Sequence, residues 1–177
     1  MKDLKSWLFS ALGAALIAIL AQVTIPFPLV PNTAQTFGIT LVAVLLGKKY
    51  GTLATFLYVL LGAIGAPVFA GFSGGFGIVI GNTGGYILAF PIVSFLIGLT
   101  SEKLREKTGL TALLAALYLT VVVLGLGTLW LNIYVHNWTT ALTAGFLPFV
   151  ITTPLQGIVG AFLAARLRKT LVQARIL

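Results

Sequence analysis

The chain has 177 residues, of which 59% are hydrophobic and only 8% are charged, and it contains no cysteine. A water-soluble domain needs roughly a quarter of its residues charged, so this composition excludes one and predicts an integral membrane protein. The formal net charge of +8 does not indicate nucleic-acid binding, because basic and aromatic residues are not interleaved, and basic residues commonly mark the cytoplasmic ends of membrane helices.

Apolar runs that can cross a bilayer, about 20 residues each, predict an all-α protein with six transmembrane helices. They are expected at about residues 7–23, 36–47, 52–64, 85–100, 110–132 and 145–171. The second and third are short for bilayer-crossing helices, and the sequence KKYG separates them. The whole chain, residues 1–177, is expected to form a single membrane domain. We interpret the first run as a helix and not as a cleaved signal peptide, because the sequence after it is membrane-like too.

The distribution of charge supports this topology. Charged residues fall at 2–5, 48–49, 102–107 and 166–175, whereas the predicted connections at 24–35, 65–84 and 133–144 contain none. Basic and uncharged connections therefore alternate, as the positive-inside rule requires. We predict that both termini are cytoplasmic.

The three uncharged connections have the features of a binding site. The first, TIPFPLVPNTAQT, has three prolines, which disfavour helix, and the third, IYVHNWTTALTAG, is aromatic and polar. The second includes GFSGGFGIVIGNTGGY, which holds seven of the 20 glycines. Irregular backbone at membrane depth persists only where it is buried in protein or lines a wet cavity, and glycine permits close backbone approach. We predict an outward-facing cavity; an ordinary glycine-rich loop is the alternative.

Such a cavity would have to bind its ligand with neutral groups, because the outer half contains no Asp, Glu, Lys or Arg. Apolar pockets with a few polar groups suit small ligands. Some outer aromatic residues instead belong to interfacial belts. The candidate binding residues are Gln35, Phe72, Gly74, Gly75, Asn82, Gly85, Tyr86, Trp138, Thr153 and Gln156.

Catalysis is not indicated. His136 is the single histidine, the three acidic residues lie among basic ones, and there is no G-x-x-x-x-G-K-[ST] motif for binding ATP. We predict no enzymatic activity, no metal site and no cofactor.

The first predicted helix contains small residues, in SALGAALIAILAQ. Ala11 and Ala15 are four residues apart and share a helix face, where small side chains allow close helix–helix approach in lipid. The face serves either packing within one bundle or docking of another membrane protein.

Two stretches carry a family resemblance: QTFGITLVAVLLGKKYGTLATFLYVLLGAIGAPVFAGFSGGFG and GNTGGYILAF. From about residue 11 to residue 169, the chain resembles the BioY family, the biotin-binding S-components of energy-coupling factor (ECF) transporters. The resemblance implies a six-helix S-component fold in a prokaryotic inner or plasma membrane and capture of the vitamin from outside. It also implies docking, here through Ala11 and Ala15, onto a transmembrane coupling protein that carries two ATPases. Some members act without that partner.

The chain departs from the family at the start of the sixth helix. Members typically have P-G-D-x-x-K there after Pro-Phe, whereas Thr153 stands here at the aspartate and Gln156 at the lysine; Asn82 replaces the proline of G-P-T-G-G-Y. Neutral hydrogen bonds contribute about 1 kcal/mol each, compared with about 1.5–3 kcal/mol for charged ones. Biotin is the expected ligand because of the family resemblance. The loss of both charged residues makes lipoate or a neutral heterocycle the alternatives. A passive small-solute facilitator or channel is a rival interpretation.

Overall fold

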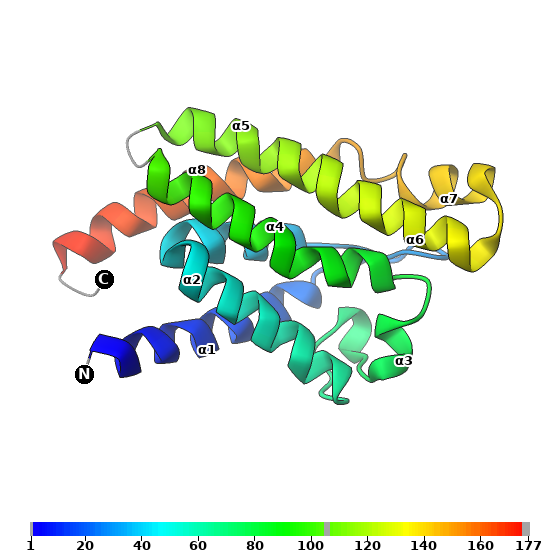
Figure 1. The fold of residues 1–177 in the computed structure, drawn as a ribbon, viewed down its shortest axis with the longest axis horizontal. Coiled ribbons are helices and arrows are strands. Elements are labelled where there is room, and N and C mark those ends of the chain that lie inside the picture. The colour runs from blue at the N-terminus through cyan, green and yellow to red at the C-terminus, as the bar shows by residue number, and fades with distance from the viewer. Residues whose placement is uncertain (1, 105–106, 175–177) are drawn as a thin grey trace.

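The computed structural model describes residues 2–104 and 107–174, which are mostly helical (Figure 1). The elements, in chain order, are α1 (Lys2–Ala21), β1 (Thr24–Ile25), β2 (Asn32–Thr33), α2 (Gln35–Ala63), a 3-10 turn (Ala70–Phe72), α3 (Phe76–Val79), α4 (Gly84–Lys103), α5 (Thr108–Tyr118), a π-helical segment (Leu119–Leu124), α6 (Gly125–Val135), α7 (Trp138–Gly145) and α8 (Thr152–Gln173). The strands β1 and β2 pair antiparallel.

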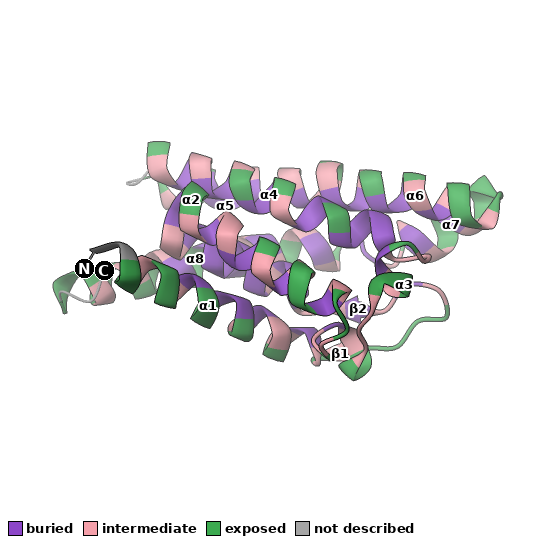
Figure 2. Cartoon of the chain, turned by 60° about the horizontal axis from the view of Figure 1, so that its bottom comes forward, coloured by how far each residue is buried: buried purple, intermediate pink, exposed green. Residues whose placement is uncertain are grey.

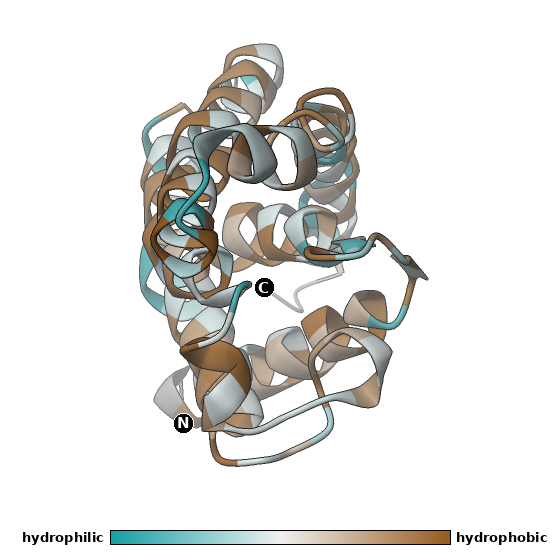
Figure 3. Ribbon diagram, turned by 90° about the vertical axis from the view of Figure 1, so that its right-hand side faces the viewer, coloured by the Kyte–Doolittle hydropathy of each residue, from teal (hydrophilic) through white to brown (hydrophobic). Residues whose placement is uncertain are grey.

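Within this described part, four helical stretches are long and apolar enough to cross a membrane: Leu4–Ala21, Gln35–Ala63, Gly84–Lys103 and Thr108–Val135. Large apolar side chains such as Leu8, Leu113 and Val121 are exposed on the outside of the bundle. Figure 3 shows hydrophobic residues on the outer faces of the helices as well as inside. Soluble monomers rarely expose apolar patches of this extent, so the surface is suited to lipid.

The helix α2 folds back on itself at Gly47, whose φ of 75° and ψ of −175° are not helical. A Cβ atom added to Gly51 would lie 2.8 Å from Cα of Ala43, a contact that a continuous helix does not permit, because eight residues of helix span about 12 Å. The helices predicted at 36–47 and 52–64 correspond to these halves. Figure 1 shows the second half running from the turn toward α3.

Glu102 of α4 holds this turn. Its Oε1 accepts a hydrogen bond from the backbone N of Lys48 at 2.9 Å, and its Oε2 lies 3.7 Å from Lys48 Nζ. The carboxylate thus occupies the positive end of the second half of α2. Gly98, one turn earlier on α4, contacts the backbone of the same turn, because a Cβ atom there would lie 2.6 Å from Lys48 N.

The central helix is α4, which packs against both α2 and α5–α6, while α1 covers α2, and α8 lies against α2 and α5. The inward face of α4 includes the fully buried Ala89, Val93 and Ile97. Figure 2 shows the buried residues along the inner faces of the helices.

The structure differs from the predicted helices in two places: one helix begins later than predicted, and one helix was not predicted. The helix expected at 145–171 begins at Thr152, after a series of turns around Pro148. The third outer connection, expected to be a loop, contains α7, and Asn137 caps it by accepting a hydrogen bond from Thr140 N at 3.0 Å. The other predicted bounds differ from those observed by between one and five residues.

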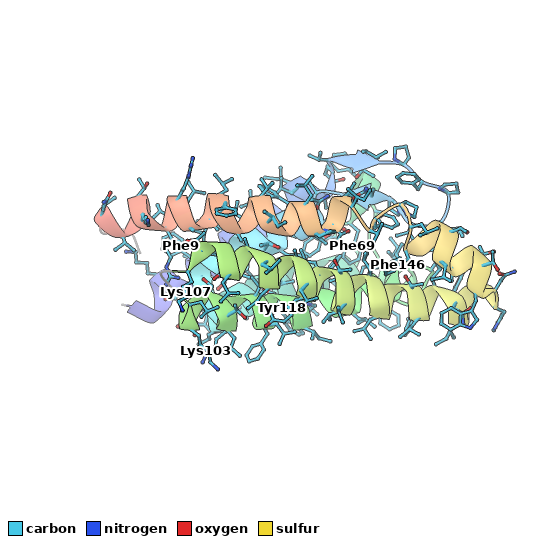
Figure 4. All side chains as sticks on the ribbon, turned by 90° about the horizontal axis from the view of Figure 1, so that it is seen from above. Phe9, Phe69, Lys103, Lys107, Tyr118 and Phe146 are labelled. Atoms are coloured by element: carbon cyan, nitrogen blue, oxygen red, sulfur yellow. The ribbon has the colours of Figure 1, made fainter. Side chains whose placement is uncertain are left out.

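The ends of the bundle differ in charge. Lys103 and Lys107 lie at one end in Figure 4, and Phe69 and Phe146 lie away from it. In Figure 1, α1 begins and α8 ends at the same end as the α4–α5 connection. The three connections predicted to face outward lie at the opposite end.

Candidate functional site

A cavity of about 260 Å³ lies where the outer connections meet α2, α4, α8 and the π-helical segment. Its volume is close to the lower end of the range for ligand pockets, roughly 300–1,000 Å³. The lining residues are Leu29, Val30, Pro31, Asn32, Thr33, Gln35, Thr36, Phe69, Ala70, Ser73, Ile78, Asn82, Thr83, Tyr86, Ile87, Phe90, Val123, Leu124, Phe149 and Thr153. The structure therefore brings four of the predicted binding residues to one wall: Gln35, Asn82, Tyr86 and Thr153.

Aromatic rings form much of the apolar wall. Phe69 is only 2% exposed, and its ring packs edge-on against Tyr58 with centroids 5.6 Å apart. It also lies directly over Gly62, where an added Cβ atom would lie 2.2 Å from Phe69 Cζ. Two further lining residues, Phe149 and Tyr86, have ring centroids 6.4 Å apart. These contacts fix the shape of the cavity.

Gln35 and Asn82 connect the cavity to its surroundings through hydrogen bonds. Gln35 Nε2 donates to the Tyr58 hydroxyl, and its Oε1 accepts from Thr33 Oγ1 at 2.9 Å. Asn82 Nδ2 donates to the backbone carbonyl of Leu29 and so ties the second outer connection to the first. Within the described part of the chain, Asn82 Oδ1 has no partner, so it is available to a ligand donor.

Tyr86 and Thr153 contribute differently. The Tyr86 hydroxyl donates to the carbonyl of Gly145 at 2.7 Å, so the tyrosine offers the cavity its ring and not a free donor. Thr153 is 4% exposed, and among the described residues its hydroxyl has no hydrogen-bond partner. The Thr153 hydroxyl is not among the fully buried unpartnered polar atoms of the described residues, and Thr153 lines the cavity. A ligand in this cavity can supply the missing partner.

The other predicted binding residues do not line the cavity. Phe72 is 73% exposed and Trp138, on α7, is 53% exposed. The glycines approach the protein itself: a Cβ atom on Gly74 would lie 2.2 Å from the Ala66 carbonyl oxygen, and one on Gly85 would lie 2.3 Å from Trp130 Cβ. Gly75, with a φ of 111°, serves the backbone turn before α3.

Gln156 lies next to the cavity but holds the first outer connection against α8. Its Oε1 accepts hydrogen bonds from the Thr36 hydroxyl and from Phe37 N, the latter at 3.2 Å. Its Nε2 donates to the carbonyl of Thr33 at 3.0 Å. Its oxygen is therefore fully used within the protein, and one of its two N–H donors is used as well.

Several polar residues at or near the cavity were not predicted as binding residues, and two of them have amide side chains. Asn32 lines the cavity, and its Nδ2 donates to Thr152 Oγ1 at 3.0 Å. Gln22, at the end of α1, donates to the carbonyls of Val68 and Phe69 and accepts from Phe72 N. A lone amide side chain beside an irregular segment was the available signal in both cases.

Charge is remote from the cavity. The last lining residues on α2, α4 and α8 are Thr36, Phe90 and Thr153. The next charged residues along these helices are Lys48, Glu102 and Arg166, at roughly 18–20 Å by the helical rise. At an effective dielectric constant near 20, two unit charges about 20 Å apart interact by only about 0.8 kcal/mol. None of the described lining residues is charged.

Comparisons with families, with individual proteins and with solved structures all find biotin transporters of the BioY type. The model of the BioY family matches residues 1–173. The chain is 45% identical to the biotin transporter BioY of Thermotoga maritima over 165 residues, which cover 90% of this chain and 93% of that protein. It is 40% identical to biotin transporter BioY2 of Lactococcus lactis over 149 residues, 84% of this chain and 81% of that protein. The crystal structure of the S-component for biotin from an ECF-type ABC transporter matches with a TM-score of 0.85 and 31% identity, covering 95% of this chain and 93% of that chain.

Proposed function

The chain belongs to the BioY family, and from that premise we propose that it is the membrane S-component that captures biotin for uptake. The observation that carries the proposal is the cavity of about 260 Å³, which is lined by aromatic side chains and neutral polar groups. The fold is that of the ECF S-component. Members of the family are transporter components and not enzymes.

We propose six membrane crossings, with both termini cytoplasmic in a prokaryotic plasma or inner membrane. In this arrangement each half of α2 crosses once, and α8, with 22 residues, is the sixth crossing. The halves of α2 span only about 18 and 24 Å at 1.5 Å per residue. Irregular outer connections must then reach membrane depth, which is tolerated where they line a cavity. The position of the basic residues at the opposite end supports this orientation.

Cysteine labelling tests the orientation, since the native chain contains no cysteine. Thr33→Cys and Thr139→Cys are expected to react with a membrane-impermeant maleimide in intact cells, and biotin is expected to protect only Thr33→Cys, which lines the cavity. The matched control, Gln173→Cys at the end of α8, should react only after permeabilisation. The reverse labelling pattern would contradict the proposed topology.

Two substitutions test the cavity itself. Asn82→Ala and Thr153→Ala are each expected to weaken biotin binding about 5- to 150-fold, because loss of a buried hydrogen bond costs about 1–3 kcal/mol. Calorimetric titration of the purified variants in detergent measures the change. Trp138→Ala, at an exposed position outside the cavity, is the control and should bind as the native protein does.

The same titration separates the rival functions. Biotin that binds with one-to-one stoichiometry supports an S-component, and lipoate binding more tightly than biotin would reassign the ligand. A passive facilitator would show no stoichiometric binding of either compound. If folded Asn82→Ala and Thr153→Ala both retain native affinity for biotin, the ligand binds elsewhere.

A further inference from the structure

The wall of the cavity is neutral throughout. The groups that can face a ligand are amides and hydroxyls, among them Asn32, Gln35, Asn82 and Thr153, together with aromatic and aliphatic side chains. Each cation described on α2 and α8 lies several helical turns away, at the opposite end of the bundle. Histidine does not supply a charge either, because His136 is exposed at the end of α6 and is not part of the wall.

These groups complement one part of biotin only. The ureido ring is neutral, with two N–H donors and one carbonyl acceptor, and amide and hydroxyl side chains can pair with both kinds of group. The free Oδ1 of Asn82 and the unpartnered hydroxyl of Thr153 are suited to the ring donors. The sulfur-containing ring and the aliphatic tail suit Phe69, Phe90 and Phe149.

The carboxylate at the end of the tail meets no opposite charge in the described wall. An ionised carboxylate is removed from water at high cost unless a cation or several N–H donors receive it. The described wall offers no cation, and its side-chain amides Asn32, Gln35 and Asn82 are neutral donors that each already donate one hydrogen bond within the protein. The carboxyl group therefore stays in water at the mouth of the cavity, accepts hydrogen bonds from neutral N–H donors, or enters uncharged, and in none of these cases does a cation pair with it.

We infer that this protein recognises the ring system of biotin and not its negative charge, so that uncharged carboxyl derivatives, namely amides and esters of biotin, are ligands as good as the free acid. The inference rests on the proposed function, since it takes biotin as the parent ligand. It concerns which class of compounds the same cavity accepts.

The experiment is titration of the purified full-length protein, freed of bound ligand, with biotin and with its primary amide at neutral pH. The amide has nearly the size of the carboxylate, so a difference in affinity reports charge and not shape. We expect the dissociation constant of the amide to be within about threefold of that of biotin, or lower. We also expect the affinity for biotin to change less than about threefold between 50 and 500 mM salt, because no ion pair is present to be screened.

Two results would overturn the inference while leaving the proposed function in place. One is an amide that binds more than tenfold more weakly than biotin, and the other is a tenfold loss of biotin affinity at high salt. If neither biotin nor its amide binds, the proposed function itself fails. The two failures are thus distinguishable in one series of titrations.

Discussion

A variant with tryptophan at both Ala11 and Ala15 is expected to bind biotin with native affinity and to lose ATP-driven uptake. We propose that these alanines dock the protein onto an ECF transmembrane coupling protein that carries two ATPases. In lipid, helices associate through close packing, which small residues permit and tryptophan prevents. The effect on transport should be complete, whereas the cavity, to which α1 contributes no lining residue, should be unaffected.

The exposure of α1 supports this proposal over internal packing. Ala11 and Ala15 are both exposed, in a stripe of large exposed side chains that includes Leu8, Leu12 and Ile19. Their side chains are much smaller than those of these exposed neighbours. Gly13, in contrast, faces inward, where a Cβ atom would lie 2.9 Å from Val42 Cγ1. Packing within the bundle therefore involves Gly13, whereas the two alanines remain exposed.

Uptake of radiolabelled biotin in cells that express the ECF module measures the first effect, and titration in detergent measures the second. Leu113→Trp, at an exposed apolar position on α5, is the control for tryptophan on the lipid-facing surface and should retain uptake. A parallel loss of binding and uptake in the Ala11→Trp, Ala15→Trp protein would mean that these residues serve the fold.

Gly98→Val is expected to be the most destabilising of the substitutions considered. The new Cβ atom would lie 2.6 Å from Lys48 N and 2.7 Å from the carbonyl carbon of Gly47, and both are backbone atoms that cannot rotate away. The helix α4 would have to separate from the α2 turn, and Glu102 would lose its hydrogen bond to Lys48 N. Overpacking of this kind costs about 1–3 kcal/mol, and more where the backbone must move.

Thermal unfolding in detergent provides the measurement. A loss of about 3 kcal/mol lowers Tm by roughly 6–12 °C in a chain of this size. Gly125→Val is the matched control, because no atom lies within 4 Å of the position of its Cβ. Equal melting temperatures for the two variants would show that the α2 turn is not held tightly against α4.

Much of the helical organisation could be predicted because lipid imposes it. The basic pair Lys48–Lys49 between two apolar runs predicted the break that the structure places at Gly47. The start of α8 was predicted about seven residues too early, because the sequence FLPFVI is as apolar as a helix would be. Hydropathy does not register that Pro148 and the turns around it interrupt the chain.

The site could be predicted only in part, for a reason visible in its glycines. Glycine indicates that something approaches the backbone closely, but the sequence does not say what. The group that approaches Gly85 is Trp130, and the group that approaches Gly74 is the Ala66 carbonyl. Neither glycine lines the cavity. Asn82 and Thr153 were predicted because isolated polar groups in an apolar context must face a cavity or a partner.

The π-helical segment Leu119–Leu124 has a consequence for how related sequences should be aligned. A π turn contains one residue more than an α turn, so it rotates α6 relative to α5 and directs Val123 and Leu124 at the cavity. A relative that lacks the extra residue would differ by a single-residue gap in the middle of a membrane helix, where alignments ordinarily forbid gaps. Forcing such a pair into ungapped register would shift every position on one side by about 100° around the helix, and would pair cavity residues with lipid-facing ones.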